Sequence, residues 1–89
     1  MARFQKAFVL IKVQPGFEKK VTEDLLKLEA VKEVHIVPGE WDIIAIVEIE
    51  KEAVVPSDQK VYSMVMEDIG KIKHIQDTNT MVSQFSKSK

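Results

Sequence analysis

The spacing of apolar residues along the chain changes several times, and each change marks a structural element. Residues 6–13 form a short apolar, β-branched run that stops at Pro15 and Gly16, which is typical of a β-strand. Residues 17–29 then place charged side chains between apolar ones at helical spacing. The apolar stripe of this predicted helix consists of Phe17, Val21, Leu25 and Leu28.

The second half of the chain predicts a β-hairpin, a helix and a last strand. Residues 31–37 and 41–49 are the predicted hairpin strands, and Pro38-Gly39 between them fits a type II turn, in which the glycine position requires a positive φ. A helix is predicted from Pro56 to a closing Gly70, and its apolar stripe consists of Val61, Met64, Val65 and Ile69. From residue 72 or 74 onward the chain is rich in Thr and Val and predicts a strand.

The order of these elements is β-α-β-β-α-β, which predicts an α+β fold of the ferredoxin-like type. Right-handed crossovers would place both helices on one face of a four-stranded antiparallel sheet. With 89 residues the chain is long enough for one domain. We expect a single domain over residues 1–85 and a flexible C-terminal tail over residues 86–89.

Two of the predicted strands, 6–13 and 41–49, are apolar on both faces, whereas the helices would cover only one face of the sheet. An open apolar face of several hundred Å² is uncommon on a soluble monomer. The chain has no cysteine, so it has no disulfide to offset its small core. We therefore expect two copies to pack sheet against sheet through an isologous interface, giving a dimeric α/β barrel.

Composition and charge argue against several classes of function. The 13 basic and 14 acidic residues give a net charge of −1, without the basic excess of a nucleic-acid-binding surface. No apolar run approaches the ~20 residues of a membrane span, and no export signal is visible. We therefore expect no direct contact with nucleic acid, no membrane association and a cytoplasmic location.

The sequence lacks a recognisable catalytic or metal-binding motif. His35 and His74 lie on different predicted strands without metal-ligand spacing. There is no glycine-rich phosphate loop, and no serine lies in a nucleophile-elbow context. We expect no metal, no cofactor and no enzymatic activity. A cofactor-free oxygenase that uses Trp41 or a histidine is the enzymatic alternative.

One group of residues has the chemistry of a ligand site. Gly39 to Asp42 open the third strand, and hydroxyls two residues apart on the last strand project from the same face. A carboxylate beside a tight turn can bind a ligand's ammonium group, while hydroxyls and backbone N–H groups can bind its carboxylate. The alternative is an ordinary turn glycine with threonines chosen for β-propensity. The candidate ligand-binding residues are Gly39, Glu40, Trp41, Asp42, Thr78 and Thr80.

These segments, in this order and spacing, resemble the regulatory (RAM) domain of the Lrp/AsnC family of amino-acid-responsive transcription regulators. The resemblance covers residues 5–83 and rests on five runs: Ala7–Val13, Pro15-Gly16, Val31–His35, Gly39–Ile43 and Thr78–Val82. It implies dimerisation through the sheets, assembly of dimers into rings, and amino-acid effectors in clefts between dimers. It also implies that the six candidate residues line such a cleft. Trp41 replaces the tyrosine that is more usual there, which bears on effector size.

Full-length members of that family carry an N-terminal helix-turn-helix domain, whereas this chain reaches its first predicted strand by about residue 6. Unless the chain is a piece of a longer protein, the resemblance therefore implies a stand-alone form that binds a free amino acid and acts on a partner, with co-assembly with full-length regulators as one route. Two alternatives stay open at this point. One is a purely structural oligomeric interaction module, and the other is a small dimeric α/β-barrel enzyme such as a monooxygenase.

Overall fold

The computed structural model describes residues 3–51, 56–87 and 89, and it confirms the predicted order of elements. The second helix changes from α-helical to π-helical geometry in its last part, which is labelled η1. The elements are β1 (Phe4–Val13), α1 (Glu18–Leu26), β2 (Val31–Ile36), β3 (Ile43–Glu50), α2 (Ser57–Met64), η1 (Val65–Ile69) and β4 (Ile75–Val82).

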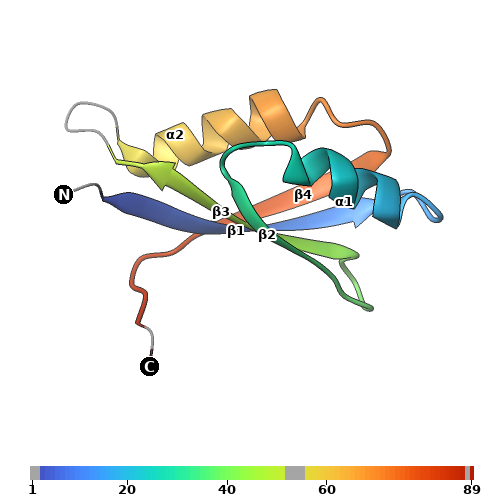
Figure 1. Cartoon of the computed structure of the whole chain (residues 1–89), viewed down its shortest axis with the longest axis horizontal. Helices are drawn as coiled ribbons and strands as arrows, with labels where there is room; N and C mark the ends of the chain where they lie inside the picture. Colours follow the sequence, from blue (N-terminus) through green and yellow to red (C-terminus); the bar gives the residue numbers. More distant parts are fainter. Residues whose placement is uncertain (1–2, 52–55, 88) are drawn as a thin grey trace.

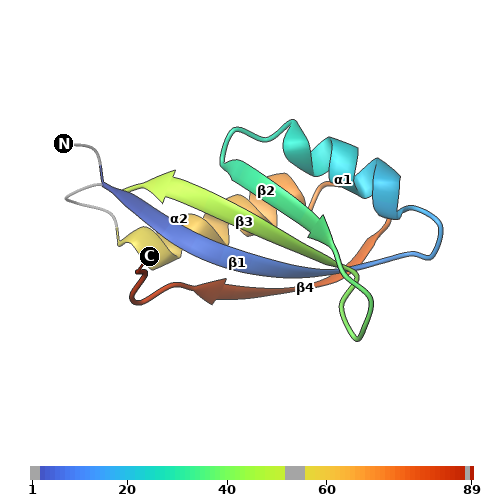
Figure 2. The ribbon, with the colours of Figure 1, turned by 60° about the horizontal axis from the view of Figure 1, so that its bottom comes forward.

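The four strands form one antiparallel sheet in the order β2-β3-β1-β4. Strand β1 lies at the centre, where it pairs with β3 on one side and β4 on the other. Both helices cover the same face of the sheet, and the opposite face is open (Figures 1 and 2). None of the helices formed by the described residues has the length and apolar character that a bilayer crossing requires.

The core lies between the sheet and the helices. Because side chains alternate across a strand, every second residue of β1 and β3 faces the helices. The buried apolar side chains of the strands pack against those of α1, α2 and η1. The residues with no exposed surface include Val9, Ile11, Val21, Leu25, Ile43, Val47, Val61 and Ile69.

The alternate residues of β1 and β3 that point away from the helices form the open face. Phe8 and Leu10 of β1 lie beside Ile46 and Ile44 of β3 in the strand register, and Met81 of β4 lies beside Phe8. These side chains are half-buried or exposed in a single copy. The two-faced apolar pattern read from the sequence is therefore confirmed for the sheet.

The hairpin differs from its prediction in where the strands end. Strand β2 ends at Ile36 and β3 begins at Ile43, so Trp41 and Asp42 belong to the connecting loop and do not open the strand. The loop is wider than a tight turn because the Val37 N–H donates to the carbonyl of Asp42 at 2.9 Å. Gly39 has the positive φ that its place after a proline predicted, at +143°.

Gly70 closes the second helix for a different reason from the one expected. A helix-terminating glycine usually adopts a left-handed conformation, but Gly70 has a φ of −61°. Its N–H donates to the carbonyl of Val65, five residues back, at 2.8 Å, as a π-helical turn requires. A Cβ at this position would lie 2.5 Å from the carbonyl oxygen of Met66. The close approach of the backbone, and not a positive φ, explains the glycine.

Candidate functional site

The loop between β2 and β3 is held to the central strand by Asp42. One carboxylate oxygen of Asp42, Oδ2, accepts a hydrogen bond from the Val13 N–H at 2.8 Å. The N–H of Asp42 donates to the carbonyl of Ile11 at 3.0 Å. The half-buried Asp42 side chain therefore fixes the loop against the end of β1, and only part of its capacity to accept hydrogen bonds is used.

Asp42 also lines a surface hollow of about 380 Å³ between the start of α1 and the hairpin. Its charged lining residues include Glu18 and Lys19, which belong to the first turn of α1. The hollow is lined by Glu18, Lys19, Ile36, Val37, Pro38 and Asp42. Its volume falls within the range of small-molecule sites, about 300–1,000 Å³. The hollow thus combines both signs of charge with an apolar side, which suits a small zwitterion with an apolar substituent.

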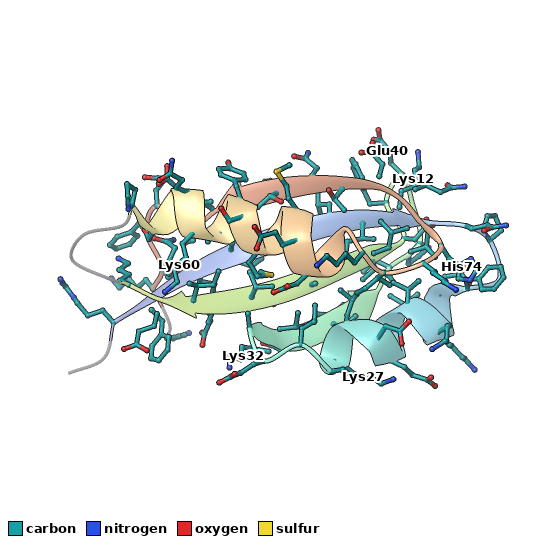
Figure 3. All side chains as sticks on the ribbon, turned by 90° about the horizontal axis from the view of Figure 1, so that it is seen from above. Lys12, Lys27, Lys32, Glu40, Lys60 and His74 are labelled. Carbon is teal, nitrogen blue, oxygen red and sulfur yellow. The ribbon has the colours of Figure 1, made fainter. Side chains whose placement is uncertain are left out.

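Trp41 lies outside this hollow. The Lys12 Nζ lies 5.9 Å from the centroid of the Trp41 ring, within the range of a cation–π contact. In the strand register Lys12 is opposite Asp77 of β4. Figure 3 labels Lys12 and Glu40 at this end of the sheet, and Lys60 at the other end. Trp41 and Glu40 therefore lie in the hairpin loop at the end of the sheet where Lys12 lies.

Thr78 and Thr80 lie on the same face of β4, as their spacing predicted. They pair with Ile11 and Val9, two buried residues that face the helices, so both threonines lie on the helix side of the sheet. Strand β1 separates them from the hairpin, because Ile11 pairs with Thr78 on one side and with Ile43 on the other. One copy therefore does not bring the threonines and the hairpin into one hollow.

The comparison with protein families decides what kind of domain this is. A family model described as the Lrp/AsnC ligand binding domain matches residues 6–87. The chain belongs to this family. The resemblance found in the sequence and the ferredoxin-like fold are both confirmed.

Relatives of this Lrp/AsnC domain come from archaea and bacteria. An uncharacterized HTH-type transcriptional regulator of Pyrococcus furiosus is 40% identical over 80 residues, which cover 86% of this chain and 49% of that protein. The chain spans about half the length of the curated relatives it matches. A hypothetical protein of Pyrococcus horikoshii has a crystal structure with a TM-score of 0.73, 32% identity and 92% coverage of both chains.

A third comparison is with a transcriptional regulator of Neisseria meningitidis, solved as an L-Met complex. Its TM-score is 0.74 at 14% identity, over 96% of this chain and 53% of that chain. At this level of identity the likeness establishes the shared fold of the domain.

The hollow in this Lrp/AsnC domain contains residues that sequence reasoning missed. In the sequence, Glu18 and Lys19 are ordinary solvent-facing positions of a helix, more than twenty residues before Asp42. Only the packing of α1 beside β2 brings them to Asp42. Farther along α1, Lys20 Nζ donates to Asp24 Oδ1 at 2.9 Å, and this hydrogen bond lowers the pKa of Asp24 and raises the pKa of Lys20.

The two histidines of the domain have separate local contacts. His35 Nε2 lies 3.2 Å from Glu33 Oε1 on β2. His74 is stacked on Phe17 with ring centroids 3.6 Å apart, and its Nδ1 lies 3.2 Å from Gln14 Oε1. Within residues 3–51, 56–87 and 89, no group of three His, Asp or Glu side chains is placed to hold a metal ion.

Proposed function

We propose that this Lrp/AsnC domain is a regulatory module that binds a free amino acid as its effector, with the hollow at Asp42 as one wall of the site. The observation that carries the proposal is the position of the Asp42 carboxylate in a hollow that also contains Lys19. Asp42 would bind the ammonium group and Lys19 the carboxylate of the effector. The apolar wall formed by Ile36, Val37 and Pro38 would contact its side chain.

The N. meningitidis regulator supports the ligand class. It shares the fold of this chain and was solved with L-Met, a free amino acid with an apolar side chain. A protein that contains a domain of this fold can therefore bind such a molecule.

The same proposal places the complete site between copies of the chain. Gly39, Glu40 and Trp41 belong to the same loop as Asp42, between β2 and β3, whereas Thr78 and Thr80 lie on the edge strand β4 beyond β1. Because one copy does not join these two groups, a neighbouring copy would complete the cleft. The apolar open face of the sheet supports a dimer as the building block, with dimers assembling into rings.

The output of such a module is proposed to be regulatory and not catalytic. The curated relatives are HTH-type transcriptional regulators of about twice the matched length. We propose that effector binding changes how this chain assembles with itself or with longer regulators of the family.

A structural interaction module is the second candidate, and the Asp42 contact favours it specifically. The hydrogen bond from the Val13 N–H gives Asp42 a role in the fold that requires no ligand. In that case the oligomer would form in the same way, and the hollow would bind no amino acid.

A thermal-shift panel of the twenty free amino acids separates the two candidates. A ligand that binds only the folded state stabilises it by ~2.7 kcal/mol at a hundredfold excess over Kd. For a domain of this size that corresponds to a rise in Tm of about 10 °C or more. We expect a selective rise for one or a few amino acids. A flat panel on ligand-free protein would contradict the effector proposal and favour the structural module.

A further inference from the structure

The segment after β4 carries the most exposed large apolar side chain among the described residues, Phe85, which is 83% exposed. The chain leaves the sheet here on the side opposite the helices, so the segment stands off the open face (Figures 1 and 2). Phe4, at the start of β1 and at the same end of the sheet, is 54% exposed. Two aromatic side chains therefore lie uncovered at one end of the open face.

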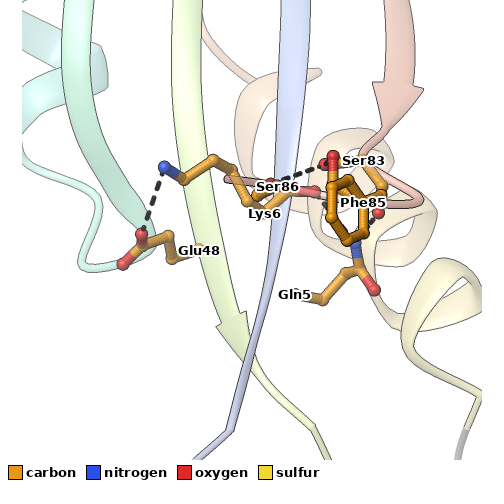
Figure 4. A network of polar contacts seen from close by, with 6 residues as sticks. All are labelled: Gln5, Lys6, Glu48, Ser83, Phe85 and Ser86. Carbon is orange, nitrogen blue, oxygen red and sulfur yellow. Dashed lines mark hydrogen bonds and ion pairs between the residues drawn. The ribbon is translucent and has the colours of Figure 1, made fainter. Parts of the chain in front are cut away.

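The backbone that carries Phe85 is held in place. The Ser83 N–H donates to the carbonyl of Lys6 at 2.9 Å. The Gln5 Nε2 donates to the carbonyl of Ser83 at 2.6 Å, and Ser83 Oγ contacts both the Phe85 carbonyl at 3.3 Å and Ser86 Oγ at 2.8 Å (Figure 4). The exposed ring is thus carried on an anchored turn. This anchoring reduces the conformational entropy that the segment would lose when a partner binds the ring.

Gln5 connects this turn to the helix side of the molecule. It is the buried polar residue of β1, and Ser57 at the start of α2 donates from its Oγ to Gln5 Oε1 at 3.1 Å. Both polar atoms of the Gln5 amide therefore have a hydrogen-bond partner. Its Oε1 accepts from Ser57 of α2, and its Nε2 donates to the Ser83 carbonyl. The direction of the C-terminal segment is set by the core and not by the tail itself.

The charges around the open face suit a second copy of the same chain. Beside Phe85, Lys6 Nζ lies 4.0 Å from Glu48 Oε1, and these residues line a groove of about 230 Å³ with Phe4 and Phe85. At the far end of the face Lys12 is opposite Asp77. Each end therefore carries both signs of charge, so a copy related by two-fold symmetry brings complementary charges in either orientation.

The size of the open face indicates how much buried area an extra aromatic residue would add to an interface between two copies. Strands rise about 3.3 Å per residue and lie about 4.8 Å apart, so four strands of this length present a flat face of roughly 500 Å². A stable pair usually buries about 800 Å² on each partner. An aromatic side chain can bury about 150–250 Å². A buried Phe85 ring would therefore add materially to the surface that the two sheets bury between them.

We propose that residues 83–86 form an arm that closes over a second copy of the chain, with the Phe85 ring buried on the rim of the partner's open face. The inference rests on the sheet-to-sheet association in the proposed function, and it adds the segment that clamps it. Two arms, one from each copy, would flank the two apolar faces.

Sedimentation velocity over a dilution series of the full chain tests the arm with the variant Phe85→Ala. Met66→Ala is the matched control, because Met66 is 77% exposed on the helix side of the molecule. We expect a wild-type dimer at micromolar concentration, a dimer Kd at least tenfold higher for Phe85→Ala, and a change below twofold for Met66→Ala. Circular dichroism verifies that each variant is folded.

Since the chain contains no cysteine, a Phe85→Cys variant can carry a single polarity-sensitive fluorophore. We expect its emission to shift to the blue as the dimer forms. A dimer that is unaffected by Phe85→Ala, or equally weakened by Met66→Ala, overturns the arm and leaves the sheet association standing. A wild-type monomer overturns both, while the amino-acid panel tests effector binding independently.

Discussion

Asp42 and Val13 are joined by a hydrogen bond of 2.8 Å between the carboxylate and the backbone N–H. The bond connects the loop that lines the hollow to the end of the central strand. The same carboxylate is the proposed ligand for an effector's ammonium group. Structural and binding roles therefore meet in one side chain, and the choice of substitution decides which role is tested.

Replacing Asp42 by Ala is expected to destabilise the fold. The part-buried N–H of Val13 would lose its acceptor, at a cost of about 1–3 kcal/mol in the free energy of unfolding. Asp42→Asn keeps an acceptor oxygen, so we expect a smaller loss. Urea unfolding checks the order of stability, with Glu40→Ala, an exposed neighbour, as a control expected within about 0.5 kcal/mol of wild type. Equal stability of Asp42→Ala and Glu40→Ala would show that the bond contributes nothing.

Gly70→Ala is expected to destabilise the end of the second helix. The new methyl group would lie 2.5 Å from the Met66 carbonyl oxygen, so the π-helical turn would have to shift. Overpacking of this kind typically costs about 1–3 kcal/mol. Ser63→Ala, at an exposed position of α2, is the control and should be neutral or slightly stabilising. Denaturant unfolding measures both, and a neutral Gly70→Ala would mean that the turn adapts freely.

His74 combines an unfavourable backbone conformation with a favourable side-chain contact. Its φ is +75°, and its ring stacks on Phe17. His74→Ala would keep the backbone cost of about 1–2 kcal/mol and lose the stack. His74→Gly would lose the stack but remove the backbone cost. We therefore expect His74→Gly to be more stable than His74→Ala by about 1 kcal/mol in thermal unfolding. The reverse order would contradict this balance.

The open face can be tested without touching the hollow. Ile46→Glu would place a charge among the apolar side chains of β3 and should prevent association of the sheets, because a charge buried without a partner is costly. Leu26→Glu, on an α1 side chain that is 56% exposed, is the control. Light scattering should give a monomer for Ile46→Glu and the wild-type mass for Leu26→Glu. An unchanged mass for Ile46→Glu would place the interface elsewhere.

The sequence was sufficient for the architecture because the fold depends on periodicity. Apolar residues at both odd and even positions of residues 6–13 and 41–49 predicted strands with two apolar faces, and the spacing of Thr78 and Thr80 placed their side chains on one face. These features depend on backbone geometry alone. The start of β3 was predicted two residues early, because the Val37–Asp42 backbone bond that widens the loop leaves no mark in the pattern.

The composition of the candidate site was harder to predict. Lys19 reaches the hollow only through the packing of α1 beside β2, and its position in the helix looks like any other exposed lysine. The separation of Thr78 from the hairpin follows from the strand order, in which β1 lies between β3 and β4. Contacts between distant segments, and contacts between copies, are set by tertiary structure and not by local spacing.

The most direct test of the effector proposal is a two-dimensional amide NMR titration of the labelled chain with each amino acid that raises its Tm, or with a mixture of all twenty if none does. The proposal predicts shifts at Glu18, Lys19 and residues 37–42, and the loss of these shifts in Asp42→Asn. If no amide moves, or if the shifts cluster away from this hollow and persist in Asp42→Asn, the hollow is not the effector site.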